Sequence, residues 1–254
     1  MPAPSYVPVR RASVEVLFTL EKEAAKPNGL QYDAATDRLL AADQRDGALI
    51  TVEDPRGARR QSEFAAGSTG PSGVTVMPWQ GEGITVMSGT HAPDLTVIDA
   101  RGDVYSVDHR GVGTGIVGFS KEPVTGQHTG FHGLEWDGGH LWAASPPARK
   151  IFRLDLQLDA DGRPMIAGCS WFPLVFGNRP HGLAWADPAR RTVWCNDTTL
   201  NCVYRYDTVS GECVEILVLP ADAPVSHGMT IVDGDLWYCE DNTARICRVV
   251  RGSG

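Results

Sequence analysis

The sequence predicts an all-β fold, a β-propeller of five four-stranded blades that is closed by the N-terminal strand. Three observations support it: a glycine phrase that recurs five times, a hairpin pattern after each copy, and an N-terminal strand without a local partner. The phrases are Pro27-Asn28-Gly29-Leu30, Pro71-Ser72-Gly73-Val74, Phe131-His132-Gly133-Leu134, Pro180-His181-Gly182-Leu183 and Ser226-His227-Gly228-Met229. Their spacings of 44, 60, 49 and 46 residues fit one blade per copy, and helical periodicity is nearly absent.

Each phrase opens an apolar strand that is followed by a turn and a second strand. In two copies the turn is an Asp-Gly pair, Asp137-Gly138 and Asp233-Gly234, which can adopt the positive φ of a type I′ hairpin turn. The other copies have longer turns. A fourth strand is expected near residues 59–65, 103–107, 165–176 and 213–219.

The last copy has no fourth strand of its own, whereas residues 13–20 form a strand placed before the first copy. Pairing these residues with the last blade closes the ring and removes exposed sheet edges. Six blades are the alternative, because the 60-residue interval has room for further strands. Residues 1–254 are interpreted as a single domain.

Composition limits the classes of partner. The net charge of −8 argues against nucleic acid and anionic membranes as partners. The first residues lack an apolar leader segment, so we expect a cytoplasmic protein, as monomer or homodimer. No C-x-x-C motif occurs, and buried free thiols are expected, with a Cys195–Cys202 disulfide as the alternative. The six cysteines are Cys169, Cys195, Cys202, Cys213, Cys239 and Cys247.

Two columns of polar residues are expected to meet at one mouth of the central channel, because two strand reversals separate them in each blade. The first column precedes the glycines: Asn28, Ser72, His132, His181 and His227. The second lies in the loops after the second strands: Asp43, Ser88, Ser145, Asp197 and Glu240, with His91, Asn196 and Asp241 beside them. The glycines themselves suit close approach of backbones at a crowded axis.

The three histidines of the first column predict a metal site. Neutral imidazole is a common ligand of transition metals, and three imidazoles leave positions open for catalysis. We therefore expect a divalent ion held by His132, His181, His227 and Asn28, with zinc, iron or manganese favoured and calcium or magnesium as alternatives. The competing interpretation is a hydrogen-bonded ring of histidines that fills a narrow channel.

The carboxylates of the second column are candidates for proton transfer. Glu240 is the first candidate for general base, followed by Asp197, His91 and Asp43, although such carboxylates are also common in solvated loops. The expected substrate pocket contains Ser72, Ser145, Asn196 and His128, and residues 111–130 are expected to form a lid over it.

The phrases at Asn28 and His181 resemble those of the gluconolactonase / senescence-marker-protein family and its strictosidine-synthase-like relatives. The stretch Asp233-Gly-Asp-Leu-Trp-Tyr-Cys-Glu240 resembles the repeat of streptogramin (virginiamycin B) lyases. The first resemblance implies lactone or ester hydrolysis at a calcium-type site, in which Asn28 matches a ligand position. His132, His181 and His227 depart from that pattern. The second implies elimination with a divalent ion, a histidine and a glutamate, and Glu240 matches that glutamate.

These observations predict a metal-dependent enzyme that acts on a small organic metabolite, with lactone or ester ring opening as the leading reaction. A lyase or isomerase of the streptogramin-lyase type and a non-catalytic binding propeller are the alternatives. The sequence contains no G-x-S-x-G, Walker or H-E-x-x-H motif, so it suggests neither a serine-hydrolase nor a nucleotide-binding mechanism.

Overall fold

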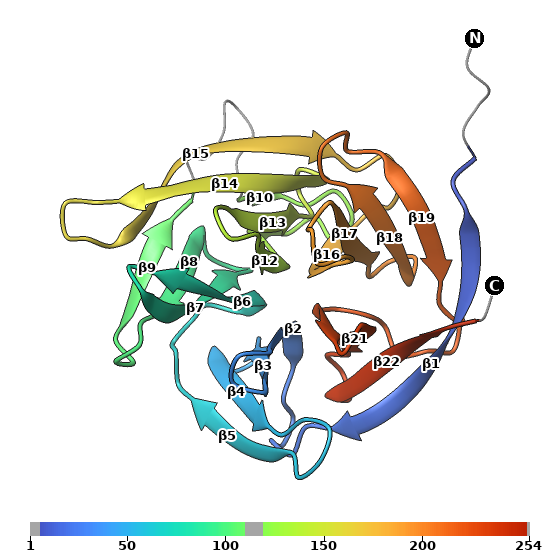
Figure 1. Ribbon diagram of the computed structural model, residues 1–254, viewed down its shortest axis with the longest axis horizontal. Helices are drawn as coiled ribbons and strands as arrows, with labels where there is room; N and C mark the ends of the chain where they lie inside the picture. Colours follow the sequence, from blue (N-terminus) through green and yellow to red (C-terminus); the bar gives the residue numbers. More distant parts are fainter. Residues whose placement is uncertain (1–5, 110–118, 253–254) are drawn as a thin grey trace.

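Strands account for the regular structure of the computed structural model, which describes residues 6–109 and 119–252. The strands form blade-like groups around a central axis, with β2, β6, β12 and β16 innermost and β5, β15, β19 and β1 outermost (Figure 1). This is the arrangement of a β-propeller. Within the described residues, no helix has the length and apolar character needed to cross a membrane.

Three groups are separate antiparallel sheets of four strands in chain order. The first contains β2 (Pro27–Asp33), β3 (Arg38–Asp43), β4 (Ala48–Glu53) and β5 (Arg60–Phe64). The second contains β6 (Pro71–Trp79), β7 (Glu82–Gly89), β8 (Asp94–Ile98) and β9 (Val104–Asp108). The third contains β12 (Leu134–Trp136), β13 (Leu141–Ser145), β14 (Lys150–Leu158) and β15 (Pro164–Pro173).

Eight further strands, apart from the separate two-stranded sheet of β10 and β11, share one sheet in the order β16-β17-β18-β19-β1-β22-β21-β20. Its first half contains β16 (Pro180–Trp185), β17 (Thr192–Asp197), β18 (Cys202–Asp207) and β19 (Cys213–Val218). Its second half contains β20 (Met229–Val232), β21 (Asp235–Cys239) and β22 (Arg245–Arg251). The two halves are joined by β1 (Val9–Thr19).

Strand β1 closes the ring, as predicted, and also makes a contact that was not predicted. It pairs antiparallel with β22, where Val14 lies opposite Val249. Its first residues pair in parallel with β19, where Arg10 lies opposite Leu217. The strand starts before the expected residue 13, because this parallel pairing satisfies the backbone of Val9 to Arg11.

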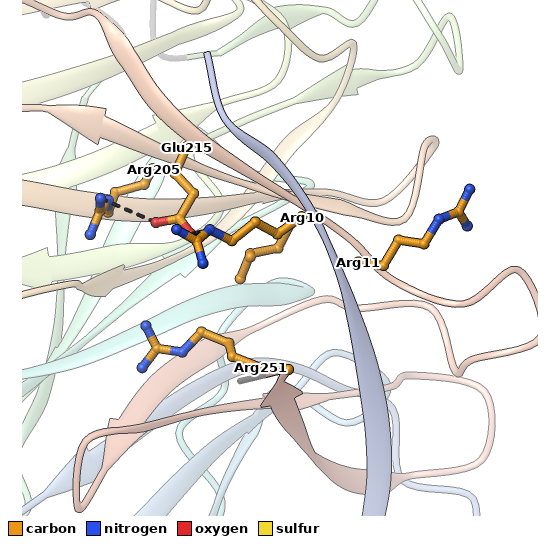
Figure 2. A pocket seen from close by; sticks show the side chains of 7 residues that line it. Arg10, Arg11, Arg205, Glu215 and Arg251 are labelled. Atoms are coloured by element: carbon orange, nitrogen blue, oxygen red, sulfur yellow. Dashed lines mark ion pairs between the residues drawn. The ribbon is translucent and has the colours of Figure 1, made fainter. Parts of the chain in front are cut away.

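A cluster of arginines lies at this seam (Figure 2). The carboxylate of Glu215 on β19 forms ion pairs with Arg10 at 3.3 Å and with Arg205 at 3.1 Å. With Arg11 and Arg251 these residues line a surface hollow of about 400 Å³, and Arg11 points away from the others. One carboxylate therefore links the side chains of β1, β18 and β19.

The hydrophobic core lies between neighbouring groups rather than within them. One cluster joins Met77 and Val86 of the second group to Leu134 and Phe152 of the third. Each of the five clusters found among the described residues bridges adjacent groups in the same way. This follows from the alternation in each strand, because both faces of a blade are covered by its neighbours.

The two Asp-Gly pairs behave differently. Asp233 and Gly234 have φ of 51° and 86°, as a type I′ turn requires. At the other pair the turn is displaced by one residue, because the Asp137 N–H donates to the His140 carbonyl at 3.2 Å and leaves Gly138 and Gly139 as the two residues of the turn between β12 and β13. The Asp137 carboxylate accepts from the backbone N–H groups of Gly139 and His140, both at 2.7 Å, and thereby stabilises this turn.

The expected lid falls partly outside the described residues, since 110–118 are not among them. The described remainder contains the short hairpin of β10 (Ser120–Lys121) and β11 (His128–Thr129). All six cysteines are unpaired, so the alternative Cys195–Cys202 disulfide is not found. Burial raises the pKa of the Cys195 thiol above its ordinary value and keeps it protonated.

Candidate functional site

The five phrase glycines form a ring at which the innermost strands touch. A Cβ built on Gly73 lies 2.0 Å from the His132 carbonyl oxygen, and one on Gly182 lies 2.3 Å from the His227 carbonyl oxygen. The other ring members are Gly29, Gly133 and Gly228, each with backbone of a neighbouring strand within 2.8 Å of a built Cβ. The space among them is too small for a water molecule. The glycine ring therefore separates the channel into two mouths.

On one side of the glycine ring lie Asn28, Ser72, His132, His181 and His227, and we call this end the histidine mouth. All five side chains are buried, with exposures of 0–7 %. The second column, which lies in the loops after the second strands, is at the same end of the channel. In the strand registers, Pro27 is opposite Asp43 and Pro180 is opposite Asp197. The two columns meet as the sequence predicts.

The histidines form a connected series. His132 Nδ1 and His181 Nε2 are 2.7 Å apart, and His132 Nε2 is 2.8 Å from the Thr129 hydroxyl. The rings of His181 and His227 are perpendicular, with centroids 4.8 Å apart. His227 Nδ1 donates to the Val225 carbonyl at 3.2 Å and lies 3.7 Å from the Asp241 carboxylate. Sequence reasoning missed Thr129, which directly precedes a glycine-rich turn and carries no repeat signal.

The histidines at this mouth are neutral at pH 7. Burial lowers the pKa of His132 and His181 well below the ordinary value, and the guanidinium of Arg179 acts in the same direction. Burial also lowers the pKa of His227, although the neighbouring Asp241 carboxylate opposes that shift. Neutral imidazoles keep one N–H donor and one acceptor each, as a hydrogen-bonded chain requires.

Four polar atoms at the histidine mouth are buried and have no hydrogen-bond partner among the described residues. They are Asn28 Oδ1, Ser72 Oγ, His181 Nδ1 and Asp241 Oδ1. Leaving such an atom unpaired costs about 1–3 kcal/mol. Buried polar atoms are normally paired, so each of these four atoms calls for a polar partner, such as a ligand or ordered water.

A second polar layer surrounds the ring. Gln44 bridges the Asn28 amide and the Thr90 hydroxyl, at 3.3 Å each. Arg179 donates to the buried Glu122 carboxylate at 3.0 Å and to the Thr198 hydroxyl at 3.2 Å. Sequence reasoning missed Gln44, Arg179 and Glu122 because they lie outside the two columns, although Arg179 stands next to a phrase.

The carboxylates of the second column stabilise their own loops. Asp43 accepts from the N–H groups of Lys26 at 2.9 Å and Arg45 at 3.1 Å. Asp197 accepts from Arg179, Thr199 and Leu200 at 2.8–2.9 Å. Both carboxylates therefore accept hydrogen bonds from the backbone of nearby loop residues. Their role as general bases stays a prediction.

Glu240, the first candidate for base, has the same kind of surroundings. Its oxygens accept from the backbone N–H groups of Asn242 and Thr243, both at 2.8 Å. Burial disfavours the charged carboxylate, but the Thr243 and Asn242 hydrogen bonds outweigh it and lower the pKa of Glu240. Asp241, one residue on, instead faces His227.

The remaining candidates are placed as follows. Asn196 is fully buried and ties the Gly182 N–H to the Ser226 hydroxyl, so it aligns neighbouring inner strands. Ser145 accepts weakly from the Ala148 N–H at 3.4 Å. His91 and His128 are exposed. An electrostatic contribution from His91 also lowers the pKa of His132.

The histidines do not converge on one point in this arrangement. Both nitrogens of His132 have partners, and one nitrogen of His181 faces His132. Within residues 6–109 and 119–252, no group of three histidine, cysteine or carboxylate side chains is placed to hold an ion. A three-imidazole metal site therefore requires the contact between His132 and His181 to open, and metal binding at these residues stays a prediction.

No family model matches the chain, and no curated protein matches it. Several solved structures are similar to it. A streptogramin B lyase is 13 % identical, with a TM-score of 0.54 over 94 % of this chain and 97 % of its own. A Myxococcus xanthus glutaminyl cyclase is 12 % identical, with a TM-score of 0.58 over 94 % and 97 %. A gluconolactonase from Xanthomonas campestris is 16 % identical, with a TM-score of 0.53 over 93 % and 79 %.

Two of these structures, the streptogramin B lyase and the gluconolactonase, are of the two kinds that the sequence motifs resemble. Identities this low show a shared fold and do not transfer an activity. The chain thus has the all-β propeller architecture common to these solved structures.

Proposed function

We propose that this protein is an enzyme that opens a small lactone or cleaves a small ester at the histidine mouth. The observation that carries the proposal is the set of four buried polar atoms, on Asn28, Ser72, His181 and Asp241, that have no hydrogen-bond partner in the described part of the chain. A bound substrate supplies the donors and acceptors that these atoms lack. The structural likeness to a gluconolactonase supports the same class of reaction.

Neutral His181 is suited to bind the carbonyl oxygen of the substrate. When Thr129 donates to His132 and His132 donates to His181, the free Nδ1 of His181 carries the proton and becomes a donor. A neutral imidazole can polarise a carbonyl without supplying a full charge. The guanidinium of Arg179 adds a positive field that favours the developing oxyanion.

Asp241 is the proposed base. Asp241 Oδ1, which has no hydrogen-bond partner among the described residues, takes a proton from a water molecule. At the same time the water oxygen bonds to the carbonyl carbon of the substrate. Collapse of the tetrahedral intermediate then breaks the ring C–O bond, and the alkoxide oxygen receives the proton held by Asp241. The products are one carboxylic acid and one alcohol.

Elimination is the second candidate, because the likeness to a streptogramin B lyase covers the chain equally well. In that reaction Asp241 removes a proton from carbon, and the ester oxygen leaves without addition of water. Mass spectrometry separates the two, because hydrolysis adds the mass of one water and elimination adds none.

The test uses γ-butyrolactone, δ-valerolactone and phenyl acetate as substrates in a pH-stat assay. We expect saturable hydrolysis of at least one substrate, and H181A and D241N should each lower kcat/KM by about 100-fold or more. H140N is the matched control, because His140 is also paired with an aspartate, at 3.2 Å, but belongs to a loop outside the mouth. Thermal unfolding of each variant shows whether lost activity reflects lost structure.

Absence of turnover with every substrate, or equal activity of H181A and wild type, contradicts the proposal. A non-catalytic binding propeller is indicated instead if the variants change only ligand affinity. Elemental analysis of the purified protein, with and without chelator, tests the predicted divalent ion independently of activity.

We also propose a count of five blades. The eight-stranded sheet divides at β1 into two groups, which with the three separate sheets make five. The five core clusters of the described residues, one between each adjacent pair of groups, support this count.

A further inference from the structure

A second polar ring lies on the other side of the glycine ring. It contains the residues two positions after the glycines, which are Gln31, Thr75, Glu135 and Thr230, with Ala184 at the fifth position. Except for Ala184, these residues line a cavity of about 420 Å³ together with Tyr32, Trp136, Trp185 and Arg190. We call this end the glutamate mouth. Its size falls in the range of small-molecule sites, about 300–1,000 Å³.

Glu135 is the distinctive residue of this cavity. Its side chain is buried, and the residue is only 5 % exposed. Burial raises the pKa of Glu135 to about 8, although backbone N–H groups of Trp136 and Trp185 and the charge of Arg190 oppose the shift. At pH 7 the group is therefore mainly a neutral carboxylic acid, which can donate as well as accept a hydrogen bond.

Two residues that line the cavity each carry a buried polar atom, one acceptor and one donor, that has no partner among the described residues. The acceptor is Gln31 Oε1 and the donor is the indole N–H of Trp136. The indole of Trp185 is already used, since it donates to the Trp136 carbonyl at 2.9 Å. Thr230 accepts from the Tyr32 N–H at 2.8 Å and still has a hydroxyl proton to donate.

The charges around the cavity are compensated locally. Arg190 donates to the Asp137 carbonyl at the rim. The Asp33 carboxylate accepts from the Ala35 N–H at 3.0 Å and from the Thr36 hydroxyl at 2.6 Å. Asp33, Tyr32, Glu135 and Arg190 are the titratable groups that line the cavity in the described structure. Gln31, Thr75 and Thr230 are polar and uncharged lining residues, and the cavity is also lined by Trp136 and Trp185.

We infer that the glutamate mouth binds a small uncharged polyhydroxy compound, such as a sugar or a cyclitol. Each hydroxyl of such a ligand both donates and accepts, which matches the free Gln31 oxygen, the Trp136 N–H and the Glu135 carboxyl group. The apolar faces of a sugar ring fit beside indoles. The site is separated from the histidine mouth by the glycine ring, so it does not depend on the proposed hydrolase function.

The test is isothermal titration calorimetry of the full chain with myo-inositol, D-glucose and D-glucosamine. At pH 6 we expect saturable binding of myo-inositol or D-glucose, and weaker binding of D-glucosamine, whose ammonium group suits an ionised carboxylate better than an acid. Between pH 6 and pH 9.5 the affinity of wild type should fall at least threefold as Glu135 loses its proton.

E135Q is the key variant, because the amide resembles the neutral acid and does not titrate. It should bind the same probe at pH 6 with affinity independent of pH, whereas E135L and Q31L should bind at least tenfold more weakly. H181A, on the other side of the glycine ring, should bind polyols like wild type. Q31L keeps the test decisive if E135L does not fold.

The inference is overturned if wild type binds neither uncharged probe. It is also overturned if D-glucosamine binds more tightly than D-glucose at pH 6, or if Q31L binds as wild type does. Loss of lactone hydrolysis in H181A with intact polyol binding separates the two sites.

Discussion

At the scale of single residues, the histidine mouth is organised by hydrogen bonds that a repeat pattern does not specify. His132 and His181 are equivalent in sequence, yet His132 has partners for both nitrogens while His181 keeps Nδ1 free. The difference arises from Thr129, which lies three residues before His132. Equivalent positions in a ring therefore acquire different chemistry from their local neighbours.

The phrase glycines should be intolerant of any side chain. In G182A the new Cβ meets the His227 carbonyl oxygen at 2.3 Å, which a rigid backbone cannot relieve cheaply. We expect the free energy of unfolding to fall by about 2–3 kcal/mol. Urea denaturation measures the loss, and G83A is the control because a Cβ there meets no atom within 4 Å. Equal stability of the two variants contradicts this account.

Glu135 should make stability depend on pH in a defined window. The folded pKa is raised from 4.5 to about 8, so the unfolded chain releases this proton first as pH rises. The contribution of Glu135 to stability should be lost between pH 4.5 and pH 8, by up to about 1.4 kcal/mol per pH unit, and stay constant above. E135Q should flatten that part of the profile. Denaturation curves of both proteins across this window provide the measurement, and parallel profiles rule out the effect.

How much of the site could be predicted depends on what each residue type signals. The glycines and the column before them were predictable, because close approach and ring position follow from the repeat. The loop-stabilising contacts of Asp43, Asp197 and Glu240 were not, since an aspartate that accepts backbone N–H groups looks the same in sequence as a catalytic one. Glu135 did leave a signal: a carboxylate in an otherwise apolar strand, two residues after a phrase glycine.

At the scale of elements, strand β1 has two different neighbours, and only one was predictable. Alternation in residues 13–20 and a missing strand in the last copy indicated the pairing with β22. The parallel contact with β19 depends on where the chain enters the ring, and no local pattern encodes that. The ion pairs of Glu215 with Arg10 and Arg205 add side-chain contacts to this backbone pairing (Figure 2).

A substitution that disrupts the pairing of β1 should therefore destabilise the closed ring of sheets. In V14P the ring nitrogen cannot donate and the proline conflicts with a strand that is paired on its β22 side, where Val14 faces Val249. We expect the free energy of unfolding to fall by about 1–3 kcal/mol, the cost of an unpaired backbone group in the sheet. V14T, which keeps the N–H and the β-branched shape, should lose far less. Thermal unfolding compares the two, and similar midpoints argue against closure by β1.

At the scale of the whole molecule, each hydrophobic cluster of the described residues joins two neighbouring groups of strands. The clusters between groups make each sheet depend on both neighbours, and β1 ties the last sheet to the one before it. We expect a single cooperative unfolding transition, with far-UV circular dichroism and tryptophan fluorescence changing together. Two separated transitions show instead that part of the ring folds independently.

The glycine ring determines how ligands can enter and leave the molecule. Because the inner strands meet there without room for water, each mouth is a blind-ended vestibule rather than one end of a passage. A ligand that enters on one face must therefore leave by the same face. A protein of this design can present two unrelated chemistries on opposite faces, with a single layer of peptide groups as the wall between them.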